Sequence, residues 1–337
     1  MKKILLILFF ALVCFTTLTN AQVITKTASV SSAHVGEIFE YTIKISGVTN
    51  LSDLGKVVDV LDPSLTYISS DFATSSQIFA FYSMYCPSTI SSLNEATSGT
   101  THTFNFPASP PCSGSVVGGY GDFSFKIKVS VNEGACSELK IINSAKLYNQ
   151  AGTNTFPSLV SKIDIDNSNP WTLKKTFRSF TGGYLIYDIR LSSSVKHYNA
   201  NVLPYTQFSD DFVTEDCMNV TSAGSEVVYI EDESNLSSTT TLPGATIAVS
   251  SGSVSLNWSL PTPTTSPTLS SYLFQVKIKV NCTCPGTFDL KNHVNLTATD
   301  ICSKDFELND DFGYQKVSDI PEFWKDIDFL RIVKKQK

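Results

Sequence analysis

Residues 36–46 read GEIFEYTIKIS, and residues 182–192 read GGYLIYDIRLS. In both stretches apolar and polar residues alternate after a glycine, which is the period of a strand with one buried face. The same alternation recurs in FSFKIKV at 123–129 and FQVKIKV at 274–280. Helical periodicity is nearly absent, while Val, Ile, Phe and Tyr are abundant. These patterns predict an all-β chain.

The alternating stretches belong to a unit that occurs twice in the chain. Lys26 and Lys175 are 149 residues apart, and so are Asn143 and Asn292. Each unit holds a set of short strands, with Pro, Gly, Ser and Asn in the predicted turns, a pattern typical of an antiparallel β-sandwich. A fixed period with conserved order predicts two tandem Ig-like antiparallel β-sandwiches.

The chain opens with a predicted secretory signal peptide. Two lysines precede a short uncharged apolar run, and small or polar residues follow it, so cleavage is expected before Gln22. No later apolar stretch reaches membrane-spanning length, so no membrane span is expected in the mature chain. The predicted layout is a signal peptide at 1–21, sandwiches at 22–163 and 170–317, a polar linker at 164–169 and a tail of unknown role at 318–337.

Charge and motifs narrow the class of function. The net charge is −6, and it becomes more negative once the two signal lysines are removed, which argues against nucleic acid or anionic membranes as partners. The four histidines have no metal-ligand spacing, and GxSxG, HExxH and phosphate-binding glycine-rich motifs are missing. We therefore expect a secreted or cell-surface protein that is not an enzyme and has no cofactor.

Four motifs of the first repeat resemble a known family. The motifs are VITKTASV at 23–30, VGEIFEYTIKIS at 35–46, VVDVLDPSLTY at 57–67 and IINSAKL at 141–147. They resemble the conserved-repeat domain of bacterial surface proteins and the related isopeptide-forming domains of fimbrial and pilin subunits. The first repeat departs from the family at Asp62-Pro63, where the proline usually comes one position earlier, and the second repeat lacks a clear third motif. The resemblance implies Ig-like sandwiches at a cell surface.

Strand parity places a lysine and an asparagine on the apolar face of each repeat. A buried lysine is costly unless it is paired or neutral. A neutral lysine amine can attack an asparagine amide and release ammonia, and a protonated carboxyl group nearby would polarise that amide. We therefore predict single-turnover crosslinks from two triads. They are Lys26, Asp59 and Asn143 in the first repeat, and Lys175, Asp210 and Asn292 in the second.

A simpler interpretation of the same residues stays open. The lysines could extend to the rim of each sandwich, and the asparagines could satisfy backbone groups in turns.

Seven cysteines follow the signal peptide, and a secreted chain is expected to form disulfides. Because seven is odd, one thiol is predicted to be free or to bond another chain. We assign that thiol to Cys136. The expected pairings are Cys86 with Cys112, and two bonds among Cys217, Cys282, Cys284 and Cys302.

The expected linker contains Asp164, Asp166 and Asn167. It resembles the calcium-binding linkers between cadherin domains, because carboxylate and amide oxygens are suitable calcium ligands. The alternative is a solvated polar linker without a metal.

The leading hypothesis is a structural or adhesive surface protein that is stabilised by crosslinks and binds other surface or matrix proteins or glycans. The alternative is an extracellular carbohydrate- or protein-binding module that uses its long loops. Aromatic residues at 79–85, namely Phe79, Phe81, Tyr82 and Tyr85, would serve such binding if they are exposed in a loop.

Overall fold

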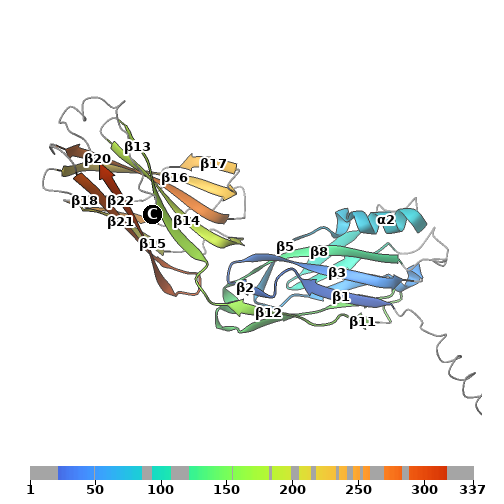
Figure 1. The fold of residues 1–337 in the computed structure, drawn as a ribbon. Helices are drawn as coiled ribbons and strands as arrows, with labels where there is room; N and C mark the ends of the chain where they lie inside the picture. Colours follow the sequence, from blue (N-terminus) through green and yellow to red (C-terminus); the bar gives the residue numbers. More distant parts are fainter. Residues whose placement is uncertain are drawn as a thin grey trace, which may run out of the picture. The chain divides into compact units, whose positions relative to one another are not determined.

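A computed structural model shows an all-β protein (Figure 1). The chain divides into two compact units. Unit 1 comprises Met1–Ser32, Phe39–Val129 and Leu139–Asp164, and unit 2 comprises Ala33–Ile38, Ser130–Glu138 and Ile165–Lys337. The structure describes residues 22–48, 50–85, 93–107, 121–153, 155–181, 184–198, 205–213, 218–232, 235–240, 246–250, 253–258, 269–282 and 288–316. The predicted signal peptide and the tail from 318 onward lie outside these residues.

Two sheets form the sandwich of unit 1, and a separate three-stranded sheet has the order β2-β12-β9. The first sheet has the order β1-β3-β8-β5, with bounds Val23–Ala28, Ile38–Val48, Gly121–Val131 and Leu65–Ser70. The second has the order β11-β10-β4-β7-β6, with bounds Thr155–Pro157, Ala145–Tyr148, Lys56–Val60, Thr101–Asn105 and Asn94–Ser98. The three short strands are Ser32–His34, Ser161–Asp166 and Lys140–Asn143.

Unit 2 repeats this topology. One sheet has the order β13-β14-β20-β16-β17, with bounds Trp171–Thr181, Tyr184–His197, Leu269–Cys282, Met218–Asp232 and Asn235–Thr240. The other has the order β18-β19-β15-β21-β22, with bounds Thr246–Ser250, Ser253–Trp258, Tyr205–Val213, Phe288–Thr299 and Asp305–Lys316. In chain order, these strands occupy the positions of the unit 1 strands, with β17 added. All registered pairings described are antiparallel, so the predicted all-β class of two successive antiparallel sandwiches is confirmed.

Aromatic rings fill the interior of unit 1. Phe72 lies 5.3 Å from Phe104 and 5.0 Å from Phe125, measured between ring centroids. All three side chains are fully or almost fully buried. Edge-to-face and tilted contacts at these distances are the favoured geometries of aromatic pairs. Because Phe104 belongs to β7 and Phe125 to β8, this cluster joins the two sheets of unit 1 in the core.

The aromatic segment that was expected to be a loop is a helix. Helix α2 spans Ser76–Tyr85, and short 3-10 turns span Leu51–Asp53, Phe72–Thr74 and Glu133–Ser137. Ile78 and Phe81 share one helical face because they are three residues apart, and both are buried. Phe81 packs 5.0 Å from the ring of Phe123, so the prediction that it is exposed was wrong. The side chains of Phe79, Tyr82 and Tyr85 lie outside the described residues.

One glycine is required by close packing of the backbone. A Cβ atom at Gly55 would lie 2.2 Å from the carbonyl oxygen of Asn149, which is backbone and cannot move aside easily. The Gly55 amide donates to Tyr148, and its carbonyl accepts from Phe106. Gly55 therefore sits where the ends of β10 and β7 meet the start of β4.

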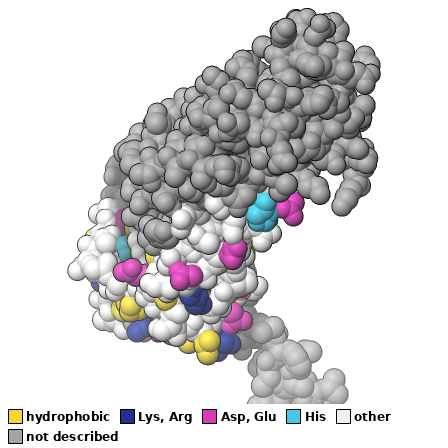
Figure 2. Space-filling view, turned by 90° about the vertical axis from the view of Figure 1, so that its left-hand side faces the viewer, with side chains coloured by type: hydrophobic (Ala, Val, Ile, Leu, Met, Phe, Trp, Pro, Cys, Tyr) yellow, Lys and Arg dark blue, Asp and Glu magenta, His cyan; other side chains and the backbone are white. Residues whose placement is uncertain are grey.

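On the described part of the face drawn in Figure 2, acidic, basic and hydrophobic side chains are dispersed among neutral ones. Within the described ranges, no helix is long and apolar enough to cross a membrane.

Candidate functional site: a buried lysine, carboxylate and amide

The predicted lysine of the first repeat lies inside unit 1. Lys26 is only 2% exposed, and its Nζ lies 2.5 Å from Oδ2 of Asp59. The same Nζ lies 4.2 Å from the ring centroid of Tyr41, where it makes a cation–π contact. Lys26 is therefore held by a carboxylate and by an aromatic face, and it does not extend to the rim.

Strand register explains this arrangement. In the β1–β3 pair, Lys26 is opposite Ile43 and Ala28 is opposite Tyr41. Lys26 and Tyr41 are thus diagonal neighbours on one face, a spacing that long and aromatic side chains can bridge.

The carboxylate lies on β4, and the amide lies at the end of β9, just before β10, which pairs with β4. Asp59 on β4 is fully buried and is opposite Ala145 on β10. Asn143 precedes Ala145 by two residues and is 2% exposed. Lys26, Asp59 and Asn143 are all buried, as their parity predicts.

Burial drives the lysine and the acid toward their neutral forms. It lowers the pKa of Lys26 to about 8, although the Asp59 carboxylate acts in the opposite direction. Burial also raises the pKa of Asp59, against the opposing effects of Lys26 and His102. Desolvation thus favours a neutral amine beside a protonated acid, which is the state that nucleophilic attack requires.

Several polar atoms of this cluster have no hydrogen-bond partner. Oδ1 of Asp59 and both Oδ1 and Nδ2 of Asn143 are three of them, and the Tyr41 hydroxyl is another. The Tyr41 hydroxyl interacts with Asn143, but neither amide atom reaches hydrogen-bond geometry. Most buried polar groups in proteins are hydrogen-bonded, so several such atoms in one cluster require an explanation.

Unit 2 reproduces the lysine side of the cluster. Lys175 is 2% exposed, and its Nζ lies 4.4 Å from the ring centroid of Tyr187. Its register matches that of Lys26, because Lys175 is opposite Ile189 and Tyr187 is opposite Phe177.

The backbone also reproduces the other half of the triad. Asp210 on β15 is opposite Val294 on β21, and Asn292 precedes Val294 by two residues. This is the same register that relates Asp59, Ala145 and Asn143 in unit 1. The side chains of Asp210 and Asn292 lie outside the described residues, so only their strand positions are known.

Sequence reasoning missed two participants in unit 1. Tyr41 shares the buried face with Lys26, and its equivalence to Tyr187 in the aligned repeats was the available signal. His102 is opposite Asp59 in the β4–β7 pair and is 1% exposed. The sequence pattern could not predict that His102 lies next to Asp59, because β7 pairs with β4 across a separation of about 40 residues.

The cysteine assignment needs correction. Cys136 forms a disulfide with Cys302, with an S–S distance of 2.02 Å, so Cys136 is not the free thiol and Cys302 does not pair with Cys217, Cys282 or Cys284. The bond joins the 3-10 turn at Glu133–Ser137 to the turn between β21 and β22, both in unit 2. Pairing by proximity in sequence fails here because 166 residues separate the partners. Cys86, Cys112, Cys217 and Cys284 lie outside the described residues, and so does the side chain of Cys282.

The three residues predicted to bind calcium each contact a different side chain. Asp164 pairs with Lys140 at 3.3 Å, and Asp166 lies 3.7 Å from the imidazole of His34. Oδ1 of Asn167 accepts from Lys304. Asp164 and Asp166 belong to strand β12, and the described residues contain no group of three or more His, Cys, Asp or Glu side chains that could hold a metal.

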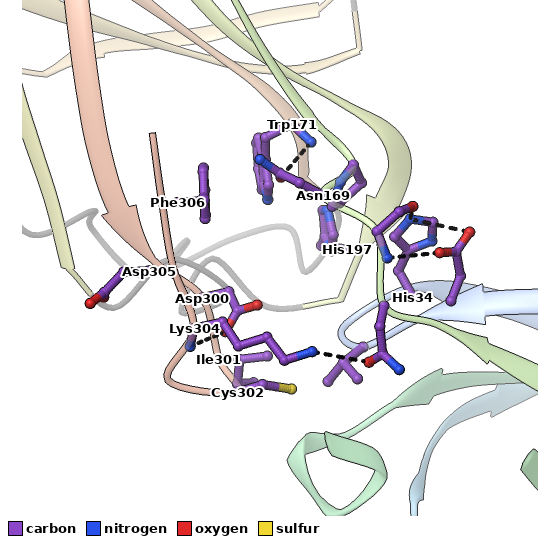
Figure 3. A pocket seen from close by; sticks show the side chains of 15 residues that line it. His34, Asn169, Trp171, His197, Asp300, Ile301, Cys302, Lys304, Asp305 and Phe306 are labelled. Atoms are coloured by element: carbon purple, nitrogen blue, oxygen red, sulfur yellow. Dashed lines mark hydrogen bonds and ion pairs between the residues drawn. The ribbon is translucent and has the colours of Figure 1, made fainter. Parts of the chain in front are cut away.

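Unit 2 contains a small pocket of about 220 Å³ with both apolar and polar walls (Figure 3). One wall is the turn between β21 and β22, where the Lys304 amide donates to Asp300. His197, buried beneath the pocket, stacks on Trp171 with centroids 5.0 Å apart. Burial lowers the pKa of His197 to about 4, which keeps its imidazole neutral at physiological pH.

Comparison with known proteins gave structural similarity only. No protein-family model matches the chain, and no curated protein sequence matches it. The major pilin subunit BcpA of Bacillus cereus is 12% identical with a TM-score of 0.33, and the match covers 88% of this chain and 66% of the pilin. The C-terminal domain of the Streptococcus pyogenes antigen I/II-family protein AspA is 11% identical with a TM-score of 0.30, covering 88% and 99%. The Enterococcus faecalis MSCRAMM ACE is 10% identical with a TM-score of 0.30, covering 89% and 97%.

Proposed function

We propose that this chain is an extracellular structural protein in which each unit forms an internal Lys–Asn isopeptide crosslink. The observation that carries the proposal is the buried Lys26–Asp59 pair beside Asn143, whose amide atoms make no hydrogen bond. A chain with paired crosslinks suits a surface or matrix role, because crosslinks oppose unfolding and proteolysis.

The reaction uses only groups present in the cluster. Lys26 transfers a proton to Asp59, and the neutral Nζ attacks Cγ of Asn143. The protonated Asp59 donates a hydrogen bond to Oδ1 and stabilises the charge that develops there. The Cγ–Nδ2 bond then breaks, and Nδ2 leaves as ammonia with a proton from the attacking nitrogen. Charge and atoms balance, because a lysine ammonium, a carboxylate and an amide become a secondary amide, a carboxylic acid and ammonia.

The product would satisfy the atoms that are unpaired before the reaction. The protonated oxygen of Asp59 can donate to the new amide carbonyl, while its other oxygen accepts from the new amide N–H. The amide nitrogen without a partner, Nδ2 of Asn143, departs. The unsatisfied arrangement is therefore the expected appearance of a cluster before its reaction.

The same reaction is proposed for Lys175, Asp210 and Asn292, on the basis of equivalent strand register. Each site reacts once with its own unit and does not turn over, so it does not make the chain an enzyme that acts on an external substrate.

The test is the intact mass of the secreted protein after reduction and alkylation. We expect a deficit of one ammonia mass per crosslink, together with a linked peptide pair containing Lys26 and Asn143. In the Lys26→Met and Lys175→Met variants, the mass deficit should be smaller than in the wild type by one ammonia mass each. The matched controls Lys44→Met and Lys174→Met change exposed lysines on neighbouring strand positions and should keep both deficits. An unmodified wild-type mass contradicts the proposal.

The pocket of unit 2 supports a second candidate, the binding of a small polar ligand with one apolar face, such as a sugar ring. Half-buried Phe306 lines this pocket together with Asp300 of the turn between β21 and β22 (Figure 3). Apolar pockets with a few converging polar groups are the usual form of small-ligand sites. Binding on a glycan array that is lost in Phe306→Ala would support this candidate, and the absence of any specific glycan would oppose it.

A further inference from the structure

A buried histidine lies next to the proposed reactive acid. His102 on β7 is directly opposite Asp59 on β4, and directly opposed residues share a face of the sheet. Its side chain is 2% exposed. A histidine in the crosslinking cluster is unexpected, because the reaction described above balances without any further base.

Three neighbouring strands surround this imidazole. On β6, Thr97 Oγ1 lies 3.2 Å and Glu95 Oε1 lies 3.5 Å from Nδ1 of His102. On β5, the ring of Tyr67 stacks on the imidazole with centroids 4.0 Å apart. On β4, Asp59 is the facing acid, and it is paired in turn with Lys26 of β1. His102 therefore lies between the carboxylate of Glu95 and that of Asp59.

The charge of His102 affects the acid that the reaction needs. A positive imidazole favours the Asp59 carboxylate, and the electrostatic effect of His102 on Asp59 acts in this direction. The carboxylate cannot donate a hydrogen bond to the Asn143 carbonyl, and it holds the Lys26 proton more firmly. A neutral imidazole does not stabilise the Asp59 carboxylate in this way, so the proton can move from Lys26 to Asp59.

We propose that His102 is a positioning residue that makes formation of the unit 1 crosslink depend on pH, with neutral His102 permitting the reaction and protonated His102 slowing it. This inference depends on the proposed crosslink. An imidazole can be neutral or protonated within the physiological pH range, which suits this type of side chain to such a control. The crosslink would then close at neutral pH and be delayed in acidic surroundings.

The experiment follows crosslinking in the full mature chain after refolding from denaturant. Samples are quenched at intervals between pH 5.5 and 7.5, and the linked peptide containing Lys26 and Asn143 is quantified by mass spectrometry. Circular dichroism in parallel separates folding from crosslinking. We expect the wild-type crosslinking rate to be several-fold lower at pH 5.5 than at pH 7.5. In His102→Gln the rate should be nearly constant over this interval.

Two further variants strengthen the test. His293→Gln removes an exposed histidine of unit 2 and should keep the wild-type profile. Glu95→Gln removes the carboxylate that favours a protonated imidazole, so the fall in rate should move to lower pH. If His102→Gln does not fold, an unchanged profile in Glu95→Gln overturns the inference by itself.

The outcomes separate the two claims. If no linked peptide forms in the wild type at any pH, the proposed function fails. If the linked peptide forms but its rate does not depend on pH, or depends on pH equally in His102→Gln, the crosslink stands and the role of His102 is refuted.

Discussion

The substitution Asn143→Leu tests the proposed crosslink through the sign of its effect on stability. Leucine has nearly the shape of asparagine but offers neither an electrophilic carbonyl nor polar atoms. If no crosslink forms, the wild type carries a buried amide with two unpaired atoms, which costs about 1–3 kcal/mol, so the variant should be more stable. If the crosslink forms, the variant should be less stable.

If the crosslink forms, the loss of stability in Asn143→Leu can be calculated from the entropy of loop closure. A bond from Lys26 to Asn143 closes a loop of 117 residues, and a crosslink over that length is worth about 5 kcal/mol at the upper end of the chain-entropy model. Typical covalent crosslinks contribute about 2–4 kcal/mol. We therefore expect Asn143→Leu to lower the free energy of unfolding of unit 1 by about 2–5 kcal/mol.

The assay must report on unit 1 alone, because a two-unit chain does not unfold in one step. All three tryptophans lie beyond residue 164, so their fluorescence does not follow unit 1. Native-state hydrogen exchange of peptides from β1 and β3 gives the local free energy of unfolding. In the double variant with Lys26→Met, the crosslink contribution should be lost only once, so the two single effects should not add. Equal or greater stability of Asn143→Leu, together with an unmodified wild-type mass, would refute the reasoning.

Three other results are expected. Replacing both Cys136 and Cys302 with serine should destabilise unit 2 by up to about 5 kcal/mol, because the disulfide closes a loop of 166 residues; tryptophan fluorescence during denaturant unfolding measures this, and a loss below 1 kcal/mol would show that the bond is dispensable. Gly55→Ala should destabilise unit 1 through its clash with the Asn149 backbone, measured by the same hydrogen exchange. The loss should exceed that in Gly99→Ala, which meets no atom within 4 Å and carries only the strain of a positive φ. In the uncrosslinked Asn143→Leu variant, the pKa of Lys26 is about 8 in the folded chain and has its ordinary value of 10.5 in the unfolded chain. Between these two pH values the unfolded chain therefore binds more protons than the folded chain. Unit 1 of this variant should therefore gain up to about 3 kcal/mol as pH rises through that window, whereas a crosslinked wild type, whose Nζ is an amide, should show no such gain from Lys26.

Strand parity was enough to place the lysines correctly. Lys26 and Lys175 each share strand parity with apolar residues two positions away, and both proved to be buried. Parity works here because β1 and β13 carry their side chains alternately inward and outward. The same rule placed Asp59 and Asn143 in the interior, although it gave no distances between them.

Local periodicity failed where a short helix was inserted. Residues 79–85 are rich in aromatic residues and have no strong alternation, a pattern that predicts a loop, whereas they belong to the helix Ser76–Tyr85. Its burial depends on Phe123, a residue about 40 positions away that offers an apolar surface to Phe81. Such a partner is invisible to a rule that considers neighbouring residues only.

The sequence alone determined the all-β class, the duplication and the inward lysines, because each depends on patterns within a strand or on spacing between repeats. Only the tertiary structure decided which groups meet: Tyr41 against Lys26, His102 opposite Asp59, and Cys136 bonded to Cys302. These contacts join residues that are far apart in sequence. Their pairing is set by sheet order and register, which arise when whole sheets pack together.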